Sequence, residues 1–180
     1  MKFENILNEN KKAILDDWFQ AILESYPPDS INFFKNKKDQ FQNPVGTTIS
    51  KGIRSIFDEI LNDFCREDIA APLDSIVKIR SVQDFSPAQA VNFVFLLKDI
   101  IRNNVGKTVS QYRLEDELYT FECRIDRLAL YAFENYMQCR EKLCEIRVKQ
   151  AKAGGFKILD RLNRKPEKAG HGSGRNTEDN

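Results

Sequence analysis

From residue 110 to residue 152 the chain contains neither glycine nor proline, and apolar residues recur along it at helical spacing. A straight helix of this length measures roughly 60 Å at 1.5 Å per residue. A compact domain of about 150 residues is only roughly 38 Å across, judged from its radius of gyration. We therefore expect a long C-terminal helix that kinks within a helical body or projects beyond it.

The rest of the sequence predicts further helices and no strands. Apolar spacing predicts a helix from Phe3 to Tyr26 and a short one that carries Ile31, Phe33 and Phe34. Proline at a first helical position indicates two more helix starts, after Asn43 and at Pro72. The expected fold class is all-α: a single bundle of about six helices, either globin-like or in another helical arrangement, with the long C-terminal helix projecting from the body.

The clearest helix start is the capping box Ser86-Pro87-Ala88-Gln89. The helix that follows is apolar around most of its circumference, so we expect it to be central and covered on several sides. Asn103, Asn104 and Gly106 are expected to end it. In the helix expected after Asn43, Gly46 and Gly52 each cost roughly 1 kcal/mol relative to alanine. Their presence predicts that a neighbouring helix packs close to that backbone.

A change of composition divides the chain at about residue 152. Gly154-Gly155 is expected to break the long helix, which makes residues 1–152 one helical domain. Residues 153–180 are expected to form a short amphipathic turn and a disordered polar tail. The body is mildly acidic, with 17 basic and 21 acidic side chains over residues 1–137. Residues 138–168 are basic, with 10 basic and 4 acidic side chains.

The histidine and acidic residues of the sequence give little support for catalysis or metal binding. The chain has one histidine, His171, and it falls in the glycine-rich tail. No histidine is therefore expected in the body for a catalytic triad, a metal site or a haem ligand. The acidic residues cluster as sequence neighbours, which point away from each other on a helix. We expect no enzyme activity, no metal and no cofactor.

The remaining composition argues for a cytoplasmic protein. The four cysteines show no CxxC spacing and no paired framework, and no secretory signal is visible. The most apolar segment, residues 90–97, is far shorter than the roughly 20 residues that cross a bilayer. The basic C-terminal segment has few aromatic residues, so nucleic-acid binding is not expected.

Charged and polar residues next to the apolar helix form a candidate polar junction. Arg80, Gln83 and Asp84 are expected to be buried and to need partners, with Arg80 pairing to Asp126 or Glu122. The junction is expected to be structural, with a ligand site as the alternative. We describe the junction residues as a set: Arg80, Gln83, Asp84, Arg124 and Asp126.

The second half of the long helix offers a candidate surface for a partner. The heptad repeat of its apolar residues weakens after residue 135, which leaves a helix with one apolar face rather than a strict coiled coil. The expected partner surface is formed by Cys139, Leu143 and Ile146. A redox role for Cys139 and Cys144 is a weaker hypothesis, because residues five apart point to different faces of a helix.

Three blocks of sequence together resemble the RsbRD N-terminal domain family. The first is Asn43-Pro44-Val45-Gly46 with the helix through Gly52, and the second runs from Ile76 to the capping box and Leu97. The third runs from Glu122 through Arg124-Ile125-Asp126 to Val148. The blocks occur in the expected order, and the resemblance covers residues from about 10 to 150.

The resemblance implies a helical sensory domain of RsbT co-antagonist proteins, placed ahead of a STAS domain in an assembly that holds the RsbT kinase. Related N-terminal domains are globin-like dimers without haem. No STAS domain follows in this chain, so we expect it to act through a homodimer and an unidentified signalling protein. The alternative function is the binding of a small hydrophobic ligand, since thirteen phenylalanines could line a cavity.

Overall fold

The computed structural model describes residues 1–27, 43–62, 65–83 and 85–163, with side chains as far as residue 157. These residues form helices and no strand, which confirms the all-α class. The helices are α1 (Phe3–Leu23), α3 (Pro44–Leu61), α4 (Arg66–Ser81), α5 (Pro87–Tyr112) and α6 (Glu115–Asn163). The short helix expected at Ile31–Phe34 and the tail with His171 lie outside the described residues. The chain divides into two units, Met1–Leu143 and Cys144–Asn180.

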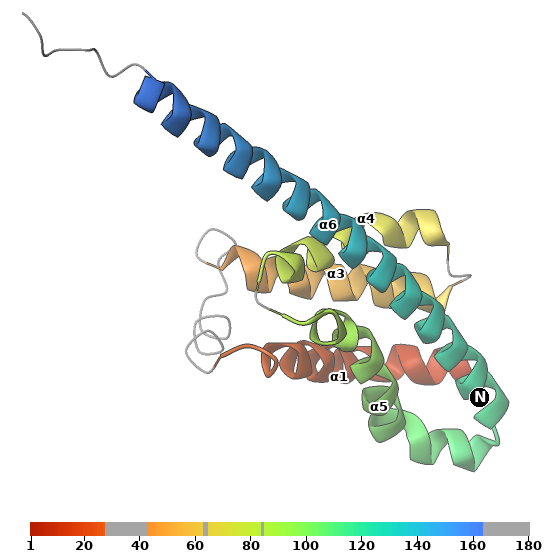
Figure 1. The fold of residues 1–180 in the computed structure, drawn as a ribbon. Helices are drawn as coiled ribbons and strands as arrows, with labels where there is room; N and C mark the ends of the chain where they lie inside the picture. Colours follow the sequence, from red (N-terminus) through yellow and green to blue (C-terminus); the bar gives the residue numbers. More distant parts are fainter. Residues whose placement is uncertain (28–42, 63–64, 84, 164–180) are drawn as a thin grey trace, which may run out of the picture. The chain divides into compact units, whose positions relative to one another are not determined.

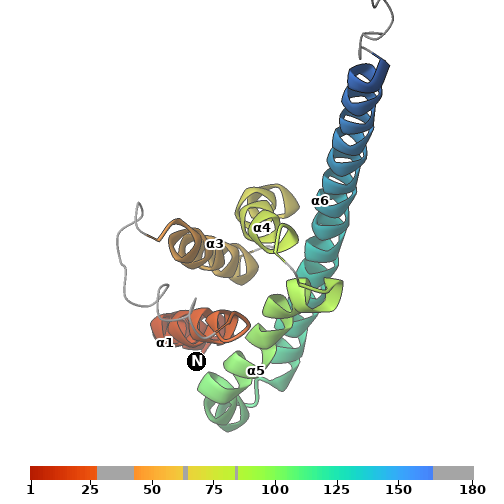
Figure 2. The ribbon, with the colours of Figure 1, turned by 60° about the vertical axis from the view of Figure 1, so that its left-hand side comes forward.

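In the first unit, α1, α3, α4, α5 and the beginning of α6 surround one apolar core. α1 packs on α5 and α3, and α3 packs on α4 (Figures 1 and 2). Trp18 of α1 is fully buried, and its indole Nε1 donates a 2.7 Å hydrogen bond to the carbonyl of Phe93 in α5. A buried indole N–H needs such a partner, so this bond fixes α1 against α5.

Two helix starts lie where the sequence predicts them. The side chain of Asn43 accepts a 2.8 Å hydrogen bond from the N–H of Gly46, and Pro44 opens α3. Ser86 and Gln89 form the complete capping box at the start of α5. Each cap satisfies backbone N–H groups that the helix itself leaves without acceptors.

Two other helix limits differ from the expectation. α4 begins at Arg66, so Pro72 lies inside the helix and does not start it. The carbonyl that loses its N–H partner there belongs to the exposed residue Asp68, where water can hydrate it. α5 continues past Gly106 because Val105 and Val109 are buried in the core. It ends at Tyr112, and the next residue, Arg113, has a φ of 55°, the left-handed conformation typical of a helix end.

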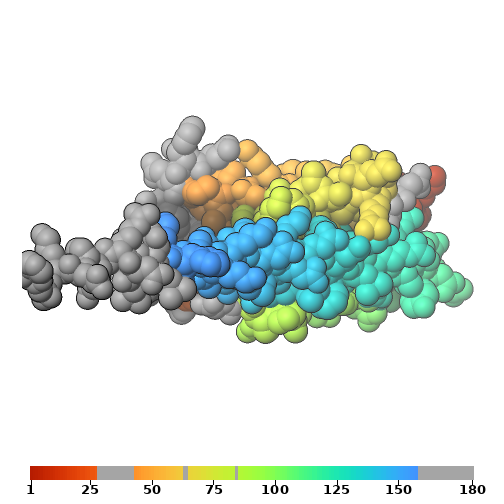
Figure 3. Space-filling model, turned by 45° about the horizontal axis from the view of Figure 1, so that its top comes forward, coloured from red at the N-terminus to blue at the C-terminus, as the bar shows by residue number. Residues whose placement is uncertain are grey.

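α6 begins beside the amino-terminus of the chain (Figure 1). The rings of Phe3 and Phe121 meet edge to face, with centroids 5.8 Å apart. Further along, the surfaces of α4 and α6 adjoin (Figure 3), and Arg66 donates a 2.8 Å hydrogen bond to Glu134. These contacts place the first half of α6 in the core, as its apolar spacing predicts.

The second unit is described only as the helical residues Cys144 to Asn163. Every side chain from Cys144 to Lys157 is exposed. The helix continues through Gly154 and Gly155, where a break was expected. A glycine weakens a helix but does not forbid it, and the domain limit at residue 152 stays a prediction.

Gly52 is the point of closest approach between α3 and α4. A Cβ atom at this position would lie 2.8 Å from Cδ1 of Ile76 and 3.3 Å from the carbonyl oxygen of Pro72. This confirms the expected close packing at Gly52. At Gly46 the space is taken by the Asn43 cap and not by a second helix.

Gly52→Ala is expected to lower the free energy of unfolding by about 1–2 kcal/mol. The overpacking against buried Ile76 outweighs the gain in helix propensity of roughly 1 kcal/mol. Gly106→Ala is the matched control, because nothing lies within 4 Å of a Cβ there. The control should raise the free energy of unfolding by roughly 0.5–1 kcal/mol. Urea unfolding of both variants checks this, and equal stabilisation of the two would contradict the close packing.

Candidate functional site

Arg80, at the end of α4, is the centre of a buried polar cluster. Its side chain is 1% exposed. Nε donates to the carbonyl of Ala90 at 3.0 Å, and Nη2 donates to the carbonyl of Gln89 at 2.9 Å and to Oγ of Ser25 at 3.1 Å. The guanidinium also stacks over the ring of Phe85, 4.3 Å from its centroid. One side chain thus connects α4 with the start of α5 and the turn after α1.

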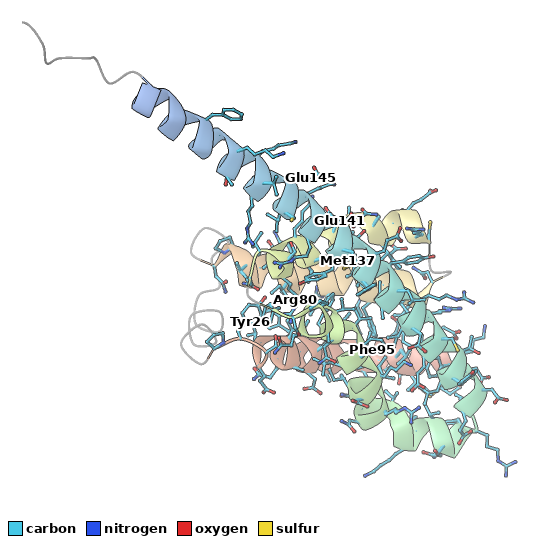
Figure 4. The ribbon with its side chains drawn as sticks, in the orientation of Figure 1. Tyr26, Arg80, Phe95, Met137, Glu141 and Glu145 are labelled. Carbon is cyan, nitrogen blue, oxygen red and sulfur yellow. The ribbon has the colours of Figure 1, made fainter. Side chains whose placement is uncertain are left out.

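Tyr26 and Gln83 complete this cluster. Arg80 and Tyr26 lie close together in Figure 4, and the guanidinium carbon lies 5.4 Å from the centroid of the Tyr26 ring. Burial raises the pKa of the Tyr26 hydroxyl above its ordinary value, while Arg80 and Gln83 oppose that rise. Burial lowers the pKa of Arg80, and Tyr26 partly offsets this. A guanidinium nevertheless stays protonated at neutral pH, so the cluster buries a positive charge.

The pairing expected for Arg80 is wrong. Asp126 pairs with Lys98 at 2.7 Å, and Glu122 accepts two hydrogen bonds from Arg102. The acceptors of Arg80 are two helix carbonyls and a hydroxyl, and no spacing in the sequence predicts them. Asp84 lies outside the described residues.

Arg124 and Asp126 are not part of the Arg80 cluster. Arg124 donates to the carbonyls of Ile60 and Asn62 at 2.9 Å and 2.6 Å. It thereby supplies donors for carbonyls left free at the end of α3. The five predicted junction residues are thus not brought together: the described ones divide among the Arg80 cluster, the end of α3, and the α5–α6 contact made by Asp126.

The three predicted partner residues differ in exposure. Cys139 is partly buried and packs against the core, and Leu143 is also partly buried. Both belong to the first unit, whereas Ile146 belongs to the second and is 49% exposed. Ile146 is therefore the predicted residue most open to a partner.

A larger apolar surface, which the sequence analysis missed, lies between α5 and α6 in the first unit. Phe95 of α5 is 45% exposed, and Leu130, Phe133 and Met137 of α6 are 69%, 47% and 39% exposed. Phe95, Leu130 and Phe133 border, with Val91, an open groove of about 610 Å³. We call this surface the α5–α6 groove. Its sequence signal was the spacing of residues 130, 133 and 137, which follows one helix face.

Phenylalanines in the described part of the chain mostly fill the core. Phe3, Phe57, Phe93 and Phe121 are buried, and Phe57 meets Phe121 edge to face at 6.5 Å. Among the described residues, no group of three or more His, Cys, Asp or Glu side chains is placed to hold a metal ion. The same residues include no helix that is long and apolar enough to cross a membrane.

Arg80→Lys is expected to lower the free energy of unfolding by about 2 kcal/mol. A single ammonium nitrogen cannot reach both carbonyls and Ser25, and it loses the stacking on Phe85. Arg54→Lys is the control, because Arg54 is exposed on α3, and it should change stability by less than about 0.5 kcal/mol. Urea unfolding measures both. An equally small effect at Arg80 would show that the fork geometry is unimportant.

Comparison with known proteins assigns the sequence to a family. The sequence model described as RsbT co-antagonist protein rsbRD N-terminal domain matches residues 12–150. An uncharacterized protein of Archaeoglobus fulgidus is 23% identical over 147 residues, which cover 80% of this chain and 86% of that protein. No solved structure matches the chain at a significant level. Because the family match spans most of the chain, the protein belongs to the RsbRD N-terminal domain family of regulatory sensor domains.

Proposed function

We propose that this protein is a non-enzymatic regulatory module of the cytoplasm that senses a signal and passes it to a partner protein. The observation that carries the proposal is membership of a regulatory sensor family over residues 12–150. The Arg80 cluster is consistent with this role. Nε and Nη2 of Arg80 donate to two backbone carbonyls and to Ser25, as expected of a structural junction.

The second unit supplies a surface suited to a partner. Ile146, Val148 and Phe156 are 49%, 47% and 72% exposed. Basic residues such as Lys149 and Lys152 lie among them on the same helix. Among residues 144–157 the charges are mainly basic, with Glu145 the one acidic residue. Apolar side chains bordered mainly by basic residues favour a protein partner with an apolar patch and an acidic rim. We propose that Ile146 contacts this partner.

A photo-reactive residue tests the partner surface. Replacement of Ile146 by p-benzoylphenylalanine should give, on irradiation in the native cell, a discrete adduct with a second protein that carries a signalling domain. Ser55, exposed on α3, takes the same residue as a control and should not give that adduct. Mass spectrometry identifies the product. Identical adducts at both positions, or a captured protein without any signalling domain, would contradict the proposal.

Binding of a small hydrophobic ligand is the second candidate function. The α5–α6 groove of about 610 Å³, bordered by Phe95 and Phe133, is the observation that favours it. Ligand sites are typically concave and mostly apolar, with a few polar groups that orient the ligand. Asn92, which also borders the groove, is such a group.

Native mass spectrometry tests the ligand candidate. A protein that binds such a ligand should retain, after gentle purification, an added mass that Phe95→Ala reduces at least about tenfold, because the variant removes apolar contact in the groove. Phe156→Ala is the control, since Phe156 is exposed in the second unit. A wild-type spectrum with only the mass of the chain would exclude this function.

A further inference from the structure

One nitrogen of the Arg80 guanidinium has no hydrogen-bond partner among the described residues. Nε and Nη2 donate to the carbonyls of Ala90 and Gln89 and to Ser25, whereas the buried Nη1 donates to none of these residues. Nη1 carries two N–H groups. A buried donor without an acceptor destabilises a folded chain, so such a group in a native structure needs an explanation. The structural junction therefore uses only part of this side chain.

The charge of Arg80 also has no carboxylate partner in the described part of the chain. The ion pairs found there use other cations, and Arg80 takes part in none of them. Tyr26, beside the guanidinium, is neutral at physiological pH because burial raises the pKa of its hydroxyl. A buried charge is normally paired with an opposite charge. Arg80 therefore combines an unused donor with an unpaired positive charge, the two properties that an anionic ligand requires.

A cavity of about 300 Å³ lies against this side chain. Arg80 lines it together with three apolar side chains, those of Phe85, Phe93 and Leu96. A cavity of roughly 150 Å³ is large enough to hold benzene. The cavity beside Arg80 therefore has room for an aromatic ring or a branched alkyl group together with an anionic group.

The walls of the cavity indicate the class of ligand. Among the described residues that line it, Arg80 is the one cation, and Glu24 is an acidic residue at an exposed position. A doubly charged anion would find one cation and be repelled by Glu24. A carboxylate carries a single charge, and its oxygens accept charge-assisted hydrogen bonds from a guanidinium. The apolar walls favour an apolar body on that carboxylate.

We propose that the cavity beside Arg80 binds a small carboxylic acid with an apolar body. Its carboxylate would accept from Nη1 of Arg80, and its apolar body would pack against Phe93 and Leu96. This inference deepens the proposed function, on which it rests, by naming the class of molecule that acts as the signal. The α5–α6 groove has no charged residue in its wall, so the two sites favour different ligands.

Two hydrogen bonds connect the wall of this cavity with α6. Oη of Tyr136 donates to the carbonyl of Phe85 at 3.2 Å, and Nη1 of Arg140 donates to the carbonyl of Ser81 at 3.3 Å. Phe85 lines the cavity, and Ser81 follows Arg80 in the chain. A ligand that displaces Phe85 or Arg80 therefore acts on the residues to which α6 is bonded.

Isothermal titration calorimetry of the full chain with phenylacetate tests the class of ligand. Phenylacetate has one ring and one carboxylate, and it should bind one to one with a dissociation constant of about 1 mM or lower. Phenylacetamide has nearly the same shape without the charge and should bind at least about tenfold more weakly. Inorganic phosphate lacks the apolar body and should also bind at least about tenfold more weakly. Equal binding of phenylacetate and either control would overturn the proposed class.

Two neighbouring residues of α5 locate the bound probe. Leu96 lines the cavity beside Arg80, whereas Phe95 borders the α5–α6 groove. Leu96→Ala should weaken the binding of phenylacetate at least about threefold, because it removes apolar contact with the ring. Phe95→Ala is the matched control and should leave the dissociation constant unchanged. The opposite result would place the probe in the groove and overturn the assignment. Circular dichroism verifies that both variants keep their helicity.

A change of charge at the cavity gives a result of the opposite sign. Glu24→Gln removes a carboxylate that repels the ligand, so it should tighten the binding of phenylacetate about threefold at low salt. Glu9→Gln is the matched control, because Glu9 is exposed on the same helix roughly 22 Å from Glu24 along its axis. Arg80→Lys should weaken binding at least about tenfold. Tightening in Glu24→Gln cannot result from a loss of stability, so it separates the charge effect from any unfolding of Arg80→Lys.

Two results would overturn the inference as a whole. One is the absence of binding by phenylacetate, 3-phenylpropionate and 4-methylpentanoate up to about 10 mM. The other is tightening of more than about tenfold in Asp84→Asn, which would assign the charge of Arg80 to a carboxylate of the chain itself. Neither result bears on the Ile146 adduct, so the proposed function would stand. Binding of the probe without that adduct would keep the carboxylate site and contradict the proposed function.

Discussion

Arg80 connects three helices through one buried side chain. It belongs to the last turn of α4, and its donors reach the turn after α1 at Ser25 and the first turn of α5 at Gln89 and Ala90. A guanidinium in an apolar interior is tolerated only while its N–H groups keep their acceptors. The three helices must therefore hold their positions for the charge to stay buried. Gly52 adds a second constraint, since α4 can lie this close to α3 only without a Cβ there.

Helix limits that depend on residues close in the sequence were predicted correctly. Those that depend on packing between helices were not. The caps at Asn43 and Ser86 were predictable because a cap depends on residues three positions apart. The end of α5 was not, because Gly106 breaks a helix only where packing permits, and buried Val105 and Val109 continue it. The predicted helix start at Pro72 was wrong for a similar reason. The destabilisation that proline causes in a helix falls here on an exposed turn, while burial of Ile69 before it and Leu73 after it stabilises the helix.

The candidate site was predicted in part. Burial of Arg80 followed from charged residues next to an apolar helix, but its partners are backbone carbonyls, which every residue carries, so the sequence could not select them. The carboxylates expected for it were already paired with nearer cations, Lys98 and Arg102. The groove was missed for another reason. The heptad through Ile125 and Ala132 marks the buried face of α6, and Leu130 and Phe133 do not belong to that repeat.

Stability of a single chain does not require the outer faces of α5 and α6 to be apolar. Exposed positions such as Leu130 usually accept polar residues with little change in stability. A cluster of exposed apolar side chains therefore indicates an interaction surface more than a folding requirement. α5 also joins that surface to the buried cluster, because Gln89 and Ala90 accept from Arg80 while Val91 and Phe95 border the groove. A shift of α5 that disturbs the Arg80 hydrogen bonds must therefore also move one wall of the groove, which connects the buried cluster physically to the exposed apolar surface.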